Sequence, residues 1–129
     1  MTQRPFAGLA LGLMIWSIPG LAHHSFASQY DADAPISLTG VVTKVEWTNP
    51  HARFYIDVED PGGEINNWNL ELASPNVLRR NGWFRTSLEA GDVVTVEGSR
   101  ARDGSHLANA RTVTLSDGSQ VFARPEVLD

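Results

Sequence analysis

The sequence predicts a small, mostly β domain. Apolar and polar residues alternate along several segments, as they do in strands that bury one face. The spacing of three and four residues that marks an amphipathic helix is scarce. A length of 129 residues fits one domain and leaves no room for a second.

The first predicted strand, Pro35–Trp47, changes its apolar phase part-way along. Ile36 and Leu38 share one face before Gly40, whereas the apolar residues from Val41 onward follow the other phase. A glycine at such a phase slip predicts a β-bulge that bends the strand. One long strand could then serve two sides of a barrel.

A hairpin is expected next, from the strands Arg53–Glu59 and Ile65–Leu72. Between them, Asp60-Pro61-Gly62-Gly63 is a turn sequence, because Pro presets one backbone dihedral and Gly permits positive φ. The residues expected to face inward are Phe54, Ile56, Val58, Trp68, Leu70 and Leu72.

A short helix is expected after the hairpin. Ser74 is a suitable N-cap, Pro75 suits the first helical position, and Gly82 is a suitable stop. The remaining strands are predicted at Val93–Ala101, Leu107–Leu115 and Gln120–Ala123.

Three strands, one short helix and two more strands, with a bent first strand, is the element order of a five-stranded OB-type barrel. A short sixth strand would pair with the fifth, and Trp83 would fill the bottom of the barrel. A small β-sandwich is the alternative. The barrel requires the first strand to pair with both the second and the fourth.

Composition excludes several classes of function. Ten basic and fifteen acidic residues give a net charge of −5, and the basic stripe that a nucleic-acid binder needs is absent. The chain has no Cys, which excludes disulfides, thiol catalysis, Cys-ligated metals and a lipoprotein anchor. Because the motifs of serine nucleophiles, phosphate loops and zinc proteases are also absent, we expect a non-enzymatic domain.

Residues 1–22 are predicted to be a secretory signal peptide. Arg4 provides a basic start, Phe6–Ile18 is an apolar run of thirteen residues, and small residues precede a cut after Ala22. A membrane anchor is the alternative, but spanning a bilayer takes roughly 18–20 apolar residues. We therefore expect a periplasmic or secreted domain, residues 23–123, without a stable membrane anchor, and a loose tail at residues 124–129.

Four histidines are candidate metal ligands. His51 and His106 fall in the predicted loops after the first strand and between the fourth and fifth, which lie beside the ligand-binding face of an OB barrel. Cleavage after Ala22 would give His23 a free α-amine, which a metal can deprotonate. That amine, the His23 imidazole and one further imidazole form a planar three-nitrogen set, called a histidine brace, that favours Cu(II).

His24 is a further candidate, but neighbouring residues of an extended chain point in opposite directions, so His23 and His24 need a turn to bind together. An exposed, disordered terminus without a metal is the alternative reading. Tyr30 could lie axial to the copper, or could simply anchor a strand.

The other polar and aromatic candidates are weaker. Asp57, Glu59 and Glu71 share outward faces and could divide acid and base roles, but outward acids on a β domain are usually solvated. A ligand or partner could contact the barrel face around Trp47, Asn49 and Tyr55 instead.

The mature sequence resembles a family of small uncharacterised bacterial exported proteins, known as a domain of unknown function. The blocks that carry the resemblance are HHSF at 23–26, TGVV at 39–42, WTNPH at 47–51, SPNxLxRxGW at 74–83, LxxGDxVxVxG at 88–98, DG at 103–104 and ANAR at 108–111. The resemblance implies export and a compact β domain, and no established activity. His23, His24 and His51 match its pattern and His106 does not, which favours a site made by the chain start and His51.

The sequence therefore predicts a periplasmic, non-enzymatic binding protein with a candidate copper site at His23, His24 and His51, and with His106 as an additional ligand candidate. The alternative is a metal-free OB-type interaction module that binds a partner protein or a small ligand.

Overall fold

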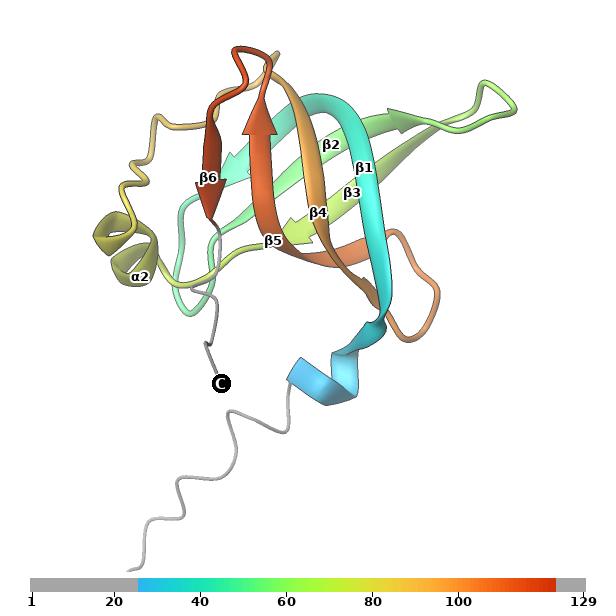
Figure 1. The fold of residues 1–129 in the computed structure, drawn as a ribbon, viewed down its shortest axis with the longest axis horizontal. Helices are drawn as coiled ribbons and strands as arrows, with labels where there is room; N and C mark the ends of the chain where they lie inside the picture. The colour runs from blue at the N-terminus through green and yellow to red at the C-terminus, as the bar shows by residue number, and fades with distance from the viewer. Residues whose placement is uncertain (1–25, 123–129) are drawn as a thin grey trace, which may run out of the picture.

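The computed structural model describes residues 26–122, which form a six-stranded β-sheet with short helical segments (Figure 1). The predicted signal peptide, His23, His24 and the predicted tail lie outside the described residues. The strands are β1 (Tyr30–Glu46), β2 (Arg53–Glu59), β3 (Ile65–Glu71), β4 (Val93–Ala101), β5 (Leu107–Leu115) and β6 (Gln120–Phe122), with helix α2 (Pro75–Arg80) between β3 and β4. No helix in this part of the chain is both long and apolar enough to span a membrane.

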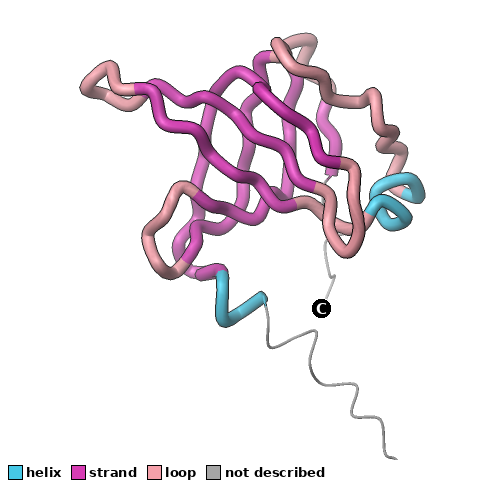
Figure 2. The backbone as a smooth tube through the Cα atoms, turned by 180° about the vertical axis from the view of Figure 1, so that it is seen from behind, coloured by secondary structure: helices cyan, strands magenta, loops and turns pink. Residues whose placement is uncertain are grey.

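The strand pairings close into a ring that begins and ends at β1. β1 pairs with β2 and also with β4, which confirms the expectation for the first strand. β3 pairs with β2 on one side and, in parallel, with β5 on the other. β5 pairs in turn with β4, and β6 pairs with β5 as expected. Figures 1 and 2 show β1 bending so that its two halves run beside different strands.

The predicted bulge at Gly40 is wrong in position. The register of β1 against β2 shifts between Val42 and Lys44, three residues further along. Val42 therefore keeps the phase of Leu38 and is buried, whereas Val41 is 43% exposed. The shift then lets Val45 also pack against the core. Gly40 has a different role, since a Cβ atom there would overlap the backbone carbonyl of Asp57 on β2.

The first strand is also longer than predicted. It begins at Tyr30 rather than Pro35, because Tyr30 pairs with Ala101 at the end of β4, and the register shifts between Tyr30 and Pro35. Residues 26–29, directly before it, are helical.

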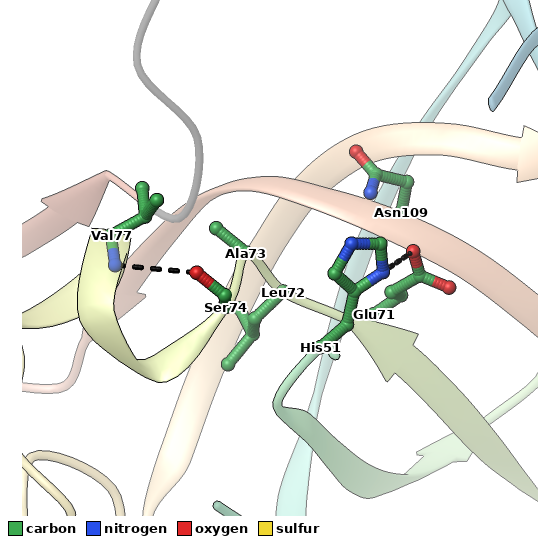
Figure 3. A pocket seen from close by; sticks show the side chains of 7 residues that line it. All are labelled: His51, Glu71, Leu72, Ala73, Ser74, Val77 and Asn109. Carbon is green, nitrogen blue, oxygen red and sulfur yellow. Dashed lines mark hydrogen bonds and ion pairs between the residues drawn. The ribbon is translucent and has the colours of Figure 1, made fainter. Parts of the chain in front are cut away.

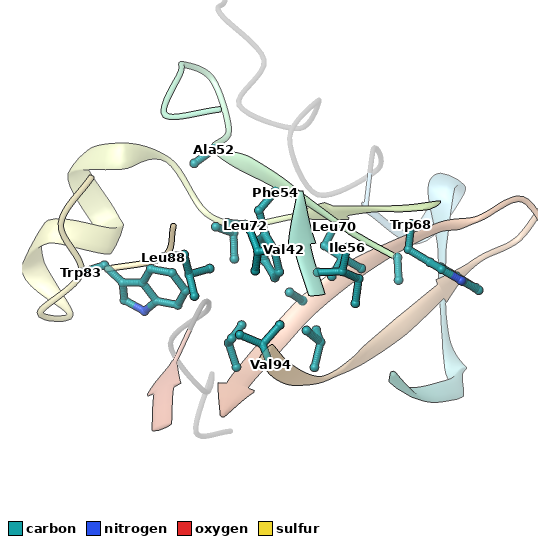
Figure 4. Packing of buried hydrophobic residues seen from close by; sticks show 14 of the residues in the cluster. Val42, Ala52, Phe54, Ile56, Trp68, Leu70, Leu72, Trp83, Leu88 and Val94 are labelled. Carbon is teal, nitrogen blue, oxygen red and sulfur yellow. The ribbon is translucent and has the colours of Figure 1, made fainter. Parts of the chain in front are cut away.

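The core lies inside the ring of strands and takes most of the residues expected there. Phe54, Ile56, Leu70 and Leu72 are buried, and Val58 packs against them. Trp83 is buried beside Leu88 near helix α2 (Figure 4). The helix begins as predicted, with the Ser74 hydroxyl accepting a hydrogen bond from the Val77 amide at 3.4 Å.

Candidate functional site

A buried carboxylate lies at the end of β3. Glu71 points to the outward face of the sheet but is only 6% exposed, so the expectation of a solvated acid is wrong. The antiparallel register sets it opposite Arg53, the first residue of β2. Arg53 Nη2 donates a hydrogen bond to Glu71 Oε2 at 2.8 Å, and Nη1 donates to Asn69 Oδ1 at 3.2 Å.

The first residue of β1 covers this carboxylate. Tyr30 is buried, and its hydroxyl donates to Glu71 Oε2 at 2.6 Å. Burial raises the pKa of the Tyr30 phenol well above its ordinary value, and the hydrogen bond to Glu71 raises it further. The phenol is thus a neutral donor at neutral pH and anchors the strand, which makes it a poor axial ligand for a metal. The Phe26 ring lies against it, with ring centroids 5.3 Å apart.

His51 binds the other oxygen of the same carboxylate. Its Nδ1 lies 2.6 Å from Glu71 Oε1 (Figure 3). An ionised carboxylate only accepts hydrogen bonds, so the Nδ1 position of the ring carries the proton in this contact, and Nε2 would keep a free lone pair in the neutral form of the ring. The His51 side chain is 49% exposed, and within residues 26–122 no group forms a hydrogen bond with Nε2. This imidazole is oriented by the protein and available to a ligand.

A cavity of about 280 Å³ opens beside this pair. His51, Glu71 and Asn109 of β5 line one side of it, and residues 72–74 with Val77 line the other (Figure 3). Asn109 lies next to Glu71 because the two residues are partners in the parallel pairing of β3 with β5.

His106 has a different environment. Its ring packs against Trp68, with centroids 4.9 Å apart, and Arg100 lies over the same indole at 5.7 Å. In the part of the chain that the structure describes, no three His, Asp or Glu side chains gather to hold a metal ion. A complete metal site at His51 would need ligands from outside residues 26–122.

The residues of the predicted ligand face lie in the loop after β1 and on β2. Trp47 packs partly against the core, and Asn49 is exposed before the cis peptide bond to Pro50. The Tyr55 hydroxyl donates to Glu46 Oε2 at 3.3 Å, and the Lys44 ammonium lies 5.6 Å from its ring centroid.

The acids outside the cluster have ordinary surroundings. Asp57 accepts a hydrogen bond from Asn67 at 2.8 Å, and Glu59 is exposed. Both carboxylates line one open cavity on the outward face of β2.

Sequence reasoning missed Asn109 and the grouping of Glu71 with Tyr30. The sequence did contain a signal for the contact between Arg53 and Glu71. The turn at residues 60–63 fixes the hairpin register that sets these two residues opposite each other. No local pattern could link Glu71 to Tyr30, since 41 residues separate them.

The protein is thus a small β domain with an oriented, half-exposed histidine in the loop after β1. A model of a family of unknown function, DUF6152, matches residues 11–110. The chain therefore belongs to this family, which confirms the resemblance to a family without an established function.

Two solved structures with a similar fold are crystal forms of Rim1, a mitochondrial single-stranded DNA binding protein from S. cerevisiae. The first has a TM-score of 0.50 and 14% identity over 64% of this chain and 93% of that chain. The second has a TM-score of 0.48 and 16% identity over 64% and 92%. At this identity the likeness concerns the fold alone and gives no sign of nucleic-acid binding. None of the curated proteins matches the chain.

Proposed function

We propose that this protein is an exported, non-enzymatic domain of the OB-barrel type that binds one Cu(II) ion. The ligands are the α-amine and imidazole of His23, freed by cleavage after Ala22, and Nε2 of His51, with His24 beside them on the same segment. Nitrogen ligands in a near-planar set favour Cu(II), which heads the affinity series of divalent first-row ions. Such a site suits copper capture or delivery to a partner protein.

The hydrogen bond between His51 and Glu71 is the observation that carries the proposal. Histidines that ligate metals commonly donate their second ring N–H to a carboxylate, which fixes the tautomer and raises ligand basicity. Here that contact is 2.6 Å, it occupies Nδ1 and not Nε2, and the His51 side chain is 49% exposed. Arg53 and Tyr30 hold the carboxylate in place from two other strands.

The described chain begins beside the cluster that holds this imidazole. The Phe26 ring contacts Tyr30, whose hydroxyl shares the Glu71 carboxylate with His51. His23 is three residues before Phe26, and three extended residues span at most about 10 Å. Cys is absent from the whole chain, so a nitrogen-based site is the option that the sequence leaves for binding copper tightly.

The strand pairings support the barrel on which this geometry depends. β1, β2, β3, β5 and β4 pair in a ring, as the strands of an OB barrel do. The loop after the first strand borders the ligand-binding face of such barrels, and His51 lies in that loop.

Copper titration of the mature chain tests the proposal. Protein prepared with an authentic His23 start is expected to bind one Cu(II) ion and to give the electron paramagnetic resonance signal of a nitrogen-rich tetragonal site. An extra Met before His23 should weaken binding, as should His51→Ala. The matched control is His106→Ala, which removes an exposed loop histidine and should leave the affinity unchanged.

Two further measurements sharpen the test. Glu71→Gln should lower the Cu(II) affinity roughly 10–100-fold, the usual effect of losing a carboxylate that orients a metal-binding histidine. The intact mass of the secreted protein should correspond to a chain that begins at His23. Equal affinity in the Met-extended, His51→Ala and unaltered proteins would refute the site and favour the metal-free interaction module.

A further inference from the structure

Within residues 26–122, four large hydrophobic side chains are exposed, and three of them lie together. Val41, Ile65 and Val93 are 43%, 56% and 48% exposed and line an open groove of about 560 Å³. The sheet register explains this grouping, because Val41 on β1 pairs with Val93 on β4 and with Asp57 on β2. Aliphatic side chains gathered in this way on a surface are typical of a contact with another molecule.

Carboxylates border this groove. Asp57 and Glu59 line it beside the aliphatic side chains, and Glu59 lies opposite Ile65 in the hairpin of β2 and β3. Residues 57–64 contain four acids and no basic residue. In the described part of the chain, neither Asp57 nor Glu59 forms an ion pair. The groove therefore suits an apolar group that is flanked by positive charge.

Phe84 is the fourth of these exposed residues, at 63%. It follows helix α2, where Gly82 has a positive φ of 86° and the next residue, Trp83, is buried. The Ser87 amide donates to the Phe84 carbonyl at 2.9 Å, and the Phe84 amide donates to the Ser87 hydroxyl at 2.8 Å. This turn holds the Phe84 backbone in place, so little conformational freedom is lost when the ring is bound.

Three arginines lie close to Phe84 in the sequence. Arg79 and Arg80 are in the last turn of α2, and Arg85 follows Phe84 directly. All three are exposed, and none of them forms an ion pair within the described chain. Residues 72–88 contain these three basic residues and no acid, in a chain whose net charge is −5. Aromatic residues and arginine are enriched at the centre of protein interfaces.

We propose that Phe84 of one copy of this chain occupies the groove of a second copy, with the arginines facing Asp57 and Glu59. The groove offers aliphatic side chains and unpaired carboxylates, and the surface around Phe84 offers one ring and unpaired guanidinium groups. Figure 1 shows α2 and the turn of the β2–β3 hairpin on opposite sides of the strands, so the contact joins different surfaces of the two copies. Such a contact is head-to-tail and can extend to further copies.

Other occupants would use only one of the two surfaces. An anionic membrane would contact Phe84 and the arginines and leave the groove empty, whereas a basic peptide would fill the groove alone. A second copy is favoured because this one sequence contains both halves of a contact that match in polarity and in charge.

Sedimentation velocity of the full chain, as its expressing cells process it and without added copper, tests the inference. An interface built on one ring and one groove belongs to the weak class, below about 1,200 Å². The average mass should therefore rise with protein concentration toward about 1 mM and fall with added salt. Phe84→Ser and Arg85→Glu should each raise the Kd of self-association at least roughly tenfold. The matched control is Arg111→Glu, which makes the same charge change at an exposed arginine of β5 and should leave the Kd unchanged.

Mixing two variants distinguishes a lost contact from a misfolded chain. Phe84→Ser keeps the groove, and Asp57→Lys keeps Phe84 and the arginines, so each variant alone should remain monomeric. An equimolar mixture should form dimers with one copy of each variant, which cannot grow further.

An unaltered protein that stays monomeric at about 1 mM, or a mixture that does not pair, would overturn the inference. An equal loss of association in Arg111→Glu and Arg85→Glu would do the same, since net charge would then be the cause. Binding of a monomeric protein to anionic phospholipid vesicles, lost in Phe84→Ser, would identify a membrane as the occupant instead. Because the assay contains no added copper, these results are independent of the proposed copper site.

Discussion

Replacing Tyr30 by Phe removes one hydroxyl from the buried cluster around Glu71. The lost hydrogen bond is 2.6 Å long, buried, and made to a charged acceptor. Bonds of this kind contribute about 1.5–3 kcal/mol, and Glu71 Oε2 retains its bond from Arg53 at 2.8 Å. We therefore expect Tyr30→Phe to lower the free energy of unfolding by about 2 kcal/mol.

Urea unfolding followed by tryptophan fluorescence measures this loss. With a slope of about 1–2 kcal/mol per molar urea for a domain of this size, the midpoint should fall by about 1–2 M. Tyr55→Phe is the matched control, since it removes the only other tyrosine hydroxyl of the chain. That hydroxyl bonds Glu46 at 3.3 Å in a half-exposed position, so the control should cost less than about 0.5 kcal/mol.

The pH dependence provides an independent check. The folded-state pKa of Tyr30 lies above the unfolded value of 10.0, first because of burial and then because of Glu71. The phenol therefore stabilises the fold fully below pH 10, and this contribution is lost as the pH rises toward the folded-state pKa. The difference in stability between Tyr30→Phe and the unaltered protein should be constant from pH 7 to 9 and should shrink above pH 10. A constant difference up to pH 11, or a control that costs as much as Tyr30→Phe, would refute the reasoning.

Three further substitutions test the fold. Val42→Ala should cost about 2 kcal/mol of unfolding free energy because the side chain is buried, whereas Val41→Ala on the exposed face should stay within about 0.5 kcal/mol; equal costs would contradict the register of β1. Ser74→Ala removes the N-cap of α2 and should lower the melting temperature by an amount equivalent to about 1 kcal/mol of unfolding free energy. Ser119→Ala, at an exposed serine, is the control. A smaller loss for Ser74→Ala than for this control would argue against the cap. Gly98→Ala should lower the free energy of unfolding, measured in urea, by at least about 1–3 kcal/mol, because the new Cβ atom would overlap the Asn109 carbonyl. An unchanged free energy would contradict the close approach of β4 to β5.

Local pattern was sufficient for much of the fold. The predicted strands Val93–Ala101 and Leu107–Leu115 have the observed bounds, because β-branched residues recur in both and each ends at a glycine-containing turn. The first strand was harder to predict. Residues 30–34 alternate as Tyr-Asp-Ala-Asp-Ala, but alanine is a weak apolar signal, and the segment joins the strand where Tyr30 pairs with Ala101 at the distant end of β4.

The candidate site was predictable only in part. His51 could be identified from its place in a loop, but its partner could not, since alternation assigns Glu71 to the solvent face. That carboxylate is buried by Tyr30 and His51, which are 41 and 20 residues away in the sequence. The place of Asn109 could not be predicted for the same reason, because only the parallel pairing of β3 with β5 sets it beside Glu71.

The cluster around Glu71 is an inefficient way to stabilise the end of a strand. A buried ionic group contributes little net stability, because desolvation offsets most of the attraction, and apolar residues of similar size often do better. Here one carboxylate nonetheless collects donors from the start of β1, the start of β2 and the loop after β1. Stability alone does not require that His51 be one of these donors, since Arg53 already neutralises the charge. What the contact adds is a ring held at Nδ1, which is the arrangement that the proposed copper site uses.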